Sequence, residues 1–163
     1  MKKLLISIVL LNFLVACASE KPKEAVAEPA PEVAAIETAP APVVEVDALD
    51  DPSNILSKRS VYFPFDVSAV QDADKPIVQA HAQYLSAHPD RSVRLEGNAD
   101  ERGSNEYNLA LGQRRADSVK KMLILGGARS SQIETVSYGE EKPVASGHNE
   151  ESWSQNRRTD IKY

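Results

Sequence analysis

The hydrophobic and polar positions divide the chain into three parts with different patterns. Residues 4–15 form an almost unbroken apolar run after two lysines. The following segment, to about residue 57, has no periodicity: Ala, Pro, Glu and Val dominate, and no aromatic residue occurs between Phe13 and Tyr62. Beyond it, apolar residues recur at the spacings of strands and helices. We therefore expect one folded domain over residues 58–163.

The pattern within this domain predicts alternating strands and helices. Alternating apolar and polar positions predict strands over residues 61–65, 92–97, 133–138 and 159–163. Helical spacing predicts helices over residues 74–88, 104–126 and 150–157. Pro76 suits a first helical turn, Ser104 can cap the second helix, and Gly126 suits its end. The element order predicts an α/β sandwich of the α+β class, with helices on one face of a sheet.

Charge and composition narrow the classes of function. The 163-residue chain has a formal net charge of -5. Residues 18–54 carry nine acidic and two basic side chains and so account for the net negative charge, whereas residues 55–163 carry equal numbers of basic and acidic side chains. The absence of a basic region argues against a nucleic-acid partner. The single cysteine excludes a disulfide framework and a Cys-based zinc site. We expect no metal or other cofactor, and we expect His81 and His88 to be exposed.

The first 17 residues have the features of a bacterial export signal. The apolar run would be about 18 Å long as a helix, which is too short for a hydrocarbon core of about 30 Å. Residues 14–17 (Leu-Val-Ala-Cys) resemble a lipobox, in which the cysteine is acylated. A chance cysteine after an ordinary signal peptide is the alternative, but an unpaired thiol is unfavourable in an oxidising compartment. We expect a lipoprotein signal peptide over residues 1–16 and lipidation at Cys17.

Residues 17–57 are expected to form the acylated cysteine and a disordered tether. Prolines break helices, and the many carboxylates repel one another, so the segment cannot bury enough apolar surface to offset its ordering entropy. Such a spacer would span about 35 Å as a coil and roughly 120 Å when fully extended. An acidic binding tail is the alternative. The predicted layout is lipid anchor, spacer and domain.

One charged residue falls within the apolar stripe of the predicted helix over residues 104–126. A helical projection places Arg115 among the core-facing positions. An unpaired buried charge is strongly destabilising, so this guanidinium needs an anion. Asp100 is the nearest candidate in the sequence, with Glu101 and Asp66 as further options. Three interpretations stay open: an internal salt bridge, an arginine whose stem only covers apolar surface, and a cation–anion pair that binds a zwitterion.

Several motifs, in the same order along the chain, resemble the OmpA-like peptidoglycan-binding domain. They are VYFPFD at residues 61–66, EGNADERG at 96–103, EYNL at 106–109, LGQRRA at 111–116, VSYGEEKP at 136–143 and NRR at 156–158. Together with the lipobox and the proline-rich spacer, they make the chain similar to the peptidoglycan-associated lipoproteins of this family. The resemblance implies a non-enzymatic domain with a mixed four-stranded sheet packed against helices.

The resemblance also implies a binding site for the peptidoglycan stem peptide, held by its meso-diaminopimelate. Asp100 would contact the ammonium group and Arg115 the carboxylate. The other residues implied to line or border the cleft are Phe65, Asp66, Asn98, Ala99, Arg102 and Leu111. The family commonly has histidine at position 98; Asn98 cannot titrate near neutrality, so pH sensitivity from that histidine should be missing here. Arg157 lies in the last motif and has no assigned role.

Partners and location follow from the same resemblance. It implies an outer-membrane lipoprotein, anchored through lipid on Cys17, whose domain faces the periplasm. Its implied partners are peptidoglycan and TolB with the Tol complex, in cell-envelope integrity and division. The alternative is an OmpA-family lipoprotein that anchors the wall without Tol partners.

Other functional classes fit the sequence less well. Adjacent Asp100 and Glu101 should point in different directions, whereas glycosidases need two carboxyl groups opposed across one bond. No serine or cysteine nucleophile motif is present. Relatives of the domain on motor stators need a membrane helix, which this sequence does not predict.

Overall fold

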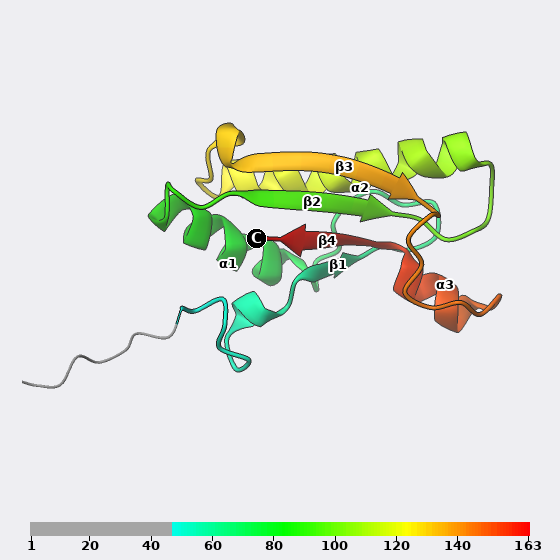
Figure 1. Cartoon of the computed structure of the whole chain (residues 1–163), viewed down its shortest axis with the longest axis horizontal. Coiled ribbons are helices and arrows are strands. Elements are labelled where there is room, and N and C mark those ends of the chain that lie inside the picture. Colours follow the sequence, from blue (N-terminus) through cyan, green and yellow to red (C-terminus); the bar gives the residue numbers. More distant parts are fainter. Residues whose placement is uncertain (1–46) are drawn as a thin grey trace, which may run out of the picture. The chain divides into compact units, whose positions relative to one another are not determined.

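The structure, a computed structural model, describes residues 47–163 and contains a four-stranded sheet with three α-helices (Figure 1). The elements in chain order are β1 (Ser60–Tyr62), α1 (Lys75–Ala87), β2 (Val93–Asn98), α2 (Asn105–Leu125), β3 (Ile133–Gly139), α3 (Glu150–Asn156) and β4 (Arg158–Lys162). The strand order is β1-β4-β2-β3. Strands β2 and β3 are parallel, and β4 is antiparallel to both of its neighbours. The expected α+β class with a mixed sheet is confirmed.

Helix ends follow the signals in the sequence. Helix α1 begins directly after Asp74 with proline in its first turn, and α2 begins after Ser104, whose Oγ accepts a hydrogen bond from the Tyr107 backbone N–H at 3.2 Å. Helix α2 ends at Leu125 with Gly126 as its C-cap, and Gly127 follows with a positive φ of 107°. These are the capping positions where such residues are favoured.

The first strand is shorter than the alternation predicts. It ends at Tyr62, although the Phe63 backbone N–H still donates to the Arg157 carbonyl at 2.9 Å. Pro64 has no N–H to continue the ladder, and Asp66 turns the chain with a φ of 57°, a conformation that Asp tolerates better than most residues. Phe65 is therefore 56% exposed instead of packing inward, so the expectation of a strand over residues 61–65 was wrong at its second half.

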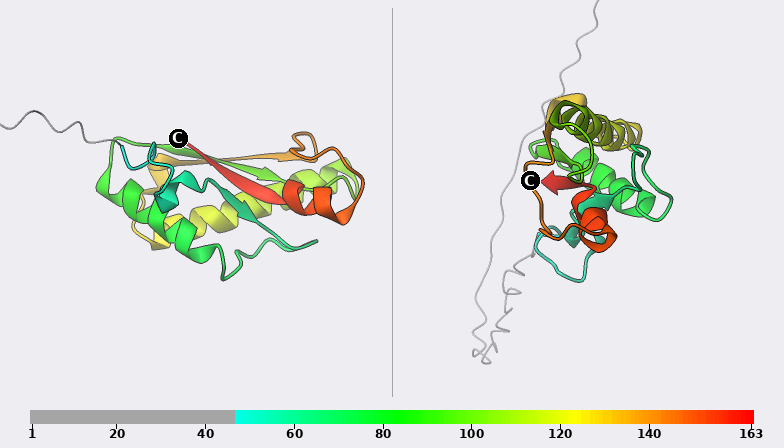
Figure 2. Two further views of the ribbon diagram at one scale, coloured as in Figure 1. Left: turned by 90° about the horizontal axis from the view of Figure 1, so that it is seen from below. Right: turned by 90° about the vertical axis from the view of Figure 1, so that its right-hand side faces the viewer.

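Helices α1 and α2 cover one face of the sheet, as the sequence predicts (Figure 2). The main core lies between these helices and the strands, and its largest fully buried apolar side chains are Val61, Val78, Leu85, Leu95, Val119, Leu123 and Ile161. Burying such side chains contributes about 1.5–3 kcal/mol each relative to exposure, which holds the two layers together.

Two glycines allow α2 to lie directly against β2. A β-carbon on Gly97 would lie 1.9 Å from the Gly112 carbonyl oxygen, so no other residue fits without moving the helix. Arg115 lies almost one turn further along α2. The close approach lets its guanidinium reach the backbone at the end of β2, where Nη1 donates to the Asn98 carbonyl at 2.8 Å.

Residues 47–57 pack against the domain, although we expected them to belong to the tether. Leu49 and Leu56 are buried against Tyr84. Asp47 accepts hydrogen bonds from the Tyr84 hydroxyl at 3.1 Å and from Arg91 at 2.6 Å. The folded unit therefore begins before residue 58. The predicted signal peptide, Cys17 and most of the predicted tether lie outside the described residues.

His81 is fully buried in α1, so the expectation of an exposed side chain was wrong. Its Nδ1 lies 2.9 Å from the Tyr163 hydroxyl, and its Nε2 lies 2.9 Å from the Lys58 carbonyl oxygen. Burial, the largest effect, lowers the pKa of this histidine below its ordinary value of 6.5. The neutral imidazole therefore links α1 to the C-terminus and to the segment that precedes β1.

We expect His81 to make the domain less stable as the pH falls. Because its pKa is lower in the folded than in the unfolded state, its stabilising contribution is complete above about pH 6.5 and is lost progressively below that pH. Urea unfolding at several pH values between 7.5 and 5 should show a steeper loss for wild type than for His81→Gln, which cannot titrate. Equal slopes would show that this histidine does not control the pH dependence.

Candidate binding site

A cavity of about 260 Å³ lies where β2 ends and α2 begins. It is lined by residues from the loop after β1, the β2–α2 loop, the first turns of α2 and the end of α3: Phe65, Asp66, Asp100, Arg102, Gly103, Tyr107, Asn108, Leu111, Arg115 and Arg157. The walls thus combine aromatic and aliphatic side chains with five charged ones. Such convergence of a few polar groups in a small concave site is typical of a ligand pocket.

Arg115 is fixed by backbone carbonyls instead of by a carboxylate. Its Nε donates to Val67 O at 2.9 Å, Nη1 to Asn98 O at 2.8 Å and Nη2 to Pro64 O at 3.1 Å. The side chain is completely buried, and within residues 47–163 no carboxylate forms a salt bridge with it. The expected direct pairing of Arg115 with Asp100, Glu101 or Asp66 was therefore wrong. The interpretation in which only the stem of Arg115 is buried and its guanidinium reaches water was wrong as well. Three of the five guanidinium N–H groups are used in this way, which leaves two.

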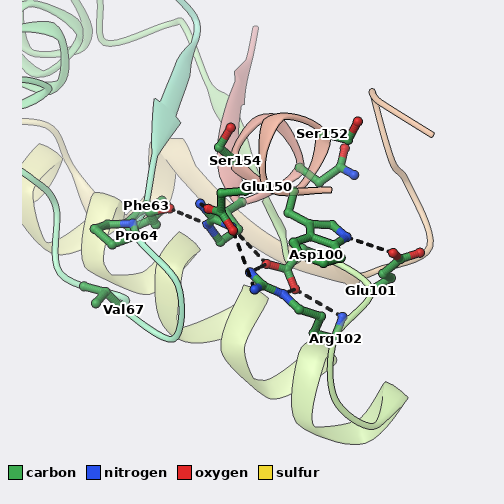
Figure 3. Close-up of polar contacts among 12 residues, drawn as sticks. Phe63, Pro64, Val67, Asp100, Glu101, Arg102, Glu150, Ser152 and Ser154 are labelled. Atoms are coloured by element: carbon green, nitrogen blue, oxygen red, sulfur yellow. Dashed lines mark hydrogen bonds and ion pairs between the residues drawn. The ribbon is translucent and has the colours of Figure 1, made fainter. Parts of the chain in front are cut away.

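Asp100 is held by two other arginines (Figure 3). Arg102 donates to Oδ1 from its backbone N–H and Nε, both at 3.1 Å, and to Oδ2 from Nη2 at 2.6 Å. Arg157 donates to Oδ2 from Nη1 at 3.1 Å. Arg157 is itself fixed by the Phe63 carbonyl at 3.0 Å and by Glu150 at 2.5 Å. The carboxylate therefore has a defined position at the cavity.

Asp100 and Arg115 both stay ionised near neutral pH. Burial by itself would raise the pKa of Asp100, but hydrogen bonds from Arg102 and Arg157 outweigh burial and hold the pKa below its usual value. Burial lowers the pKa of Arg115 to about 10, and the nearby Asp100 charge opposes this shift. The lining carries two carboxylates and three guanidinium groups, and the Glu150 carboxylate beside it pairs with Arg157 and lies close to Arg102.

Aromatic side chains form the outer part of the site. The Arg102 guanidinium carbon lies 4.1 Å from the ring centre of Phe65 and 4.1 Å from that of Trp153, so the guanidinium packs against both rings. Trp153 donates from Nε1 to Glu101 at 2.8 Å, and His148 contacts the same carboxylate at 2.8 Å. Glu101 points away from Asp100 (Figure 3), as expected for adjacent residues in a turn.

Six of the eight predicted site residues line the cavity, and two do not. Ala99 is buried and lines a neighbouring hollow of about 300 Å³ instead. Asn98 is buried at the end of β2; its side chain donates to Glu96 O at 3.0 Å, and only its backbone carbonyl reaches Arg115. Both residues are therefore buried next to the site and do not line the cavity.

The sequence interpretation missed four lining residues. Gly103, Tyr107 and Asn108 lie in motifs that were recognised but not used, and Arg157 lies in the NRR motif without a role. Tyr107 donates its hydroxyl hydrogen to Asp66, and Asn108 donates to Glu140 at 2.5 Å. Arg157 could have been predicted as a site residue, because it is an arginine within a family motif and had no assigned partner.

Residues 47–163 contain no group of three or more His, Cys, Asp or Glu side chains that could hold a metal ion. No helix in the same residues has the length and apolar character needed to cross a membrane. The charged and polar side chains that line the cavity can pair with ligand charges and form hydrogen bonds.

Comparison with known proteins places this domain in a family. The model of the OmpA family matches residues 62–157. The chain belongs to the OmpA family. This OmpA-family chain is 51% identical over 105 residues to the peptidoglycan-associated lipoprotein of Pasteurella multocida, covering 64% of this chain and 70% of the relative. The corresponding protein of Pseudomonas putida is 44% identical over 115 residues, covering 71% and 69% of the two chains.

A solved structure supports the same assignment of the OmpA-family domain. The crystal structure of the peptidoglycan-associated lipoprotein from Burkholderia pseudomallei superposes with a TM-score of 0.71 at 56% identity, over 72% of this chain and 99% of that chain. The names of these relatives describe association with peptidoglycan and no reaction. The expectation of a non-enzymatic protein agrees with them.

Proposed function

We propose that the cavity binds the peptidoglycan stem peptide through the amino-acid end of meso-diaminopimelate. The observation that carries this proposal is the buried Arg115 in the lining of a cavity that also contains Asp100: among residues 47–163, only three of its five N–H groups have a hydrogen-bond partner. A ligand carboxylate would pair with the Arg115 guanidinium, and a ligand ammonium group would lie against the Asp100 carboxylate. The family and the names of its relatives point to the same polymer.

The preorganised geometry supports recognition of a zwitterion more than of a simple anion. Arg115 is held by Pro64, Val67 and Asn98, and Asp100 is held by Arg157, so neither charged group has to be ordered when a ligand arrives. Ordering side chains is a main cost of binding, and a fixed site avoids it. Leu111 and Phe65 offer apolar contact to the methylene chain between the two ends of such a ligand.

We further propose that the protein is anchored in the outer membrane through lipid on Cys17 and that its domain faces the periplasm. Several acyl chains together hold a protein stably at a membrane, because each buried methylene contributes about 0.8 kcal/mol. TolB and the Tol complex are proposed partners on the resemblance alone, with wall anchoring without Tol partners as the alternative. Mass spectrometry of the mature N-terminus tests the lipid anchor.

Calorimetric titration of residues 47–163, which contain the whole sheet and its helices, tests the binding proposal. The ligand is a stem tripeptide that ends in meso-diaminopimelate, and the control is the same tripeptide with lysine, which lacks the second carboxylate. We expect the lysine peptide to bind at least about tenfold more weakly, because the Arg115 guanidinium then has no anion to meet. Equal affinity for the two peptides, or no binding of either, would refute the proposal.

A further inference from the structure

The Asp100 carboxylate has no free acceptor position in this structure. A carboxylate offers about four lone-pair positions. Oδ1 accepts from the Arg102 backbone N–H and Nε, and Oδ2 accepts from Arg102 Nη2 and Arg157 Nη1. An ammonium group that binds Asp100 must therefore displace one of these donors.

The Arg102 side chain is the donor that can leave. The side chain of Arg157 is 6% exposed and is fixed by Phe63 and Glu150 as well. The side chain of Arg102 is 30% exposed, and among residues 47–163 its strong hydrogen bonds go only to Asp100. Displacing Arg157 would leave a buried guanidinium short of a partner, whereas displacing Arg102 would not.

A second carboxylate is in place to receive the displaced guanidinium. Arg102 Nη1 lies 3.6 Å from Glu150 Oε2, while Arg157 uses the other oxygen of Glu150. The guanidinium carbon lies 4.1 Å from the ring centres of both Phe65 and Trp153, and these rings can stay in contact with the guanidinium when it shifts toward Glu150. In Figure 3, dashed lines join the Arg102 guanidinium to both Asp100 and Glu150.

We propose that Arg102 is a specificity-determining residue: in the free protein its guanidinium occupies the position on Asp100 that a ligand ammonium takes, and a ligand binds by displacing it onto Glu150. This inference rests on the proposed function. An amine alone competes poorly with a bidentate, stacked arginine. A ligand that also places a carboxylate on Arg115 has enough additional binding energy to displace it. Arg102 thereby selects zwitterionic ends over plain amines.

Replacing Arg102 by methionine tests this inference, because methionine keeps an apolar stem between the rings and removes the competing cation. We expect the diaminopimelate tripeptide to bind about tenfold more tightly to Arg102→Met than to wild type, and the preference over the lysine tripeptide to shrink. Arg102→Gln, which can still donate one hydrogen bond, should fall between the two. Arg94→Met is the matched control: Arg94 pairs with Glu134 at 3.0 Å, away from the cavity, and its loss should leave the affinity unchanged.

The single tryptophan provides a second readout in the same titration. Trp153 stacks on the Arg102 guanidinium, so ligand binding to wild type should change its fluorescence, whereas binding to Arg102→Met should change it much less. Weaker or unchanged binding by folded Arg102→Met would overturn the inference and identify Arg102 as a ligand contact or a bystander. If wild type binds neither tripeptide, the proposed function fails, and that result is distinguishable from either outcome for Arg102.

Discussion

Arg115→Met should lower the free energy of unfolding of the domain by about 3 kcal/mol, because buried carbonyl groups lose their donor. The carbonyls of Pro64, Val67 and Asn98 all accept from this guanidinium. Removing the charge itself is favourable, since burial destabilises an unpaired cation, so the net loss is smaller than three lost hydrogen bonds would suggest. Urea unfolding followed by circular dichroism measures the change.

The neighbouring arginine is a matched control. Arg114 lies on the exposed side of α2, and Arg114→Met should change the free energy of unfolding by less than about 0.5 kcal/mol. Arg115→Lys should also be destabilised, because an ammonium group cannot reproduce the fork of donors that joins three carbonyls. Similar stabilities for Arg114→Met and Arg115→Met would contradict the structural role assigned to Arg115.

The expected loss of stability in Arg115→Met means that Arg115 can have a structural role and a binding role at the same time. Three of its N–H groups connect the loop after β1 to the end of β2, and the same side chain lines the cavity. Loss of sacculus binding by an alanine variant at this position would therefore not separate binding from folding. Asp100 offers the cleaner test, since its contacts are with side chains and one loop N–H.

Local signals in the sequence predict much of the fold. Ser104 and Pro76 mark helix starts because their chemistry acts within one turn, and alternation marks strands that are buried on one face. The same reasoning fails after Tyr62, where Pro64 interrupts the ladder and the chain turns. It also fails for residues 47–57, whose order depends on Leu49 meeting Tyr84, a contact between segments distant in sequence.

Prediction of the site from the sequence is limited in the same way, because contacts between distant segments cannot be inferred from local signals. Helical periodicity identifies Arg115 as buried, and the motifs bring Asp100 to the same cavity. The partners of these groups cannot be read from the sequence: the donor that completes the Asp100 shell is Arg157, 57 positions away, and Arg115 is satisfied by main-chain oxygens. Backbone acceptors leave no residue-type signal, which is why a carboxylate partner was expected.

Asp100→Asn should reduce affinity for the diaminopimelate tripeptide by at least about 100-fold, because the ammonium group loses its counter-charge and meets an amide that presents donors. It should also lower stability, since the buried Arg157 then keeps only Glu150 as a charged partner. Calorimetry on protein shown to be folded at the titration temperature measures the first effect. Glu101→Gln is the matched control: it removes the adjacent carboxylate, which points away from Asp100, and should change affinity by less than about threefold.

The pH dependence of the affinity for the tripeptide distinguishes binding by the charges of Asp100 and Arg115 from a general loss of folding. The pKa of Asp100 is lowered, so its charge is present above its ordinary value of 3.8 and is lost only as the pH falls through its lower folded value. The pKa of Arg115 is about 10, so the guanidinium stays charged up to that pH. Position 98 is asparagine, which does not titrate. Wild-type affinity should therefore stay nearly constant between pH 5 and pH 9, and a strong rise or fall within this window would show that a group other than these two controls binding.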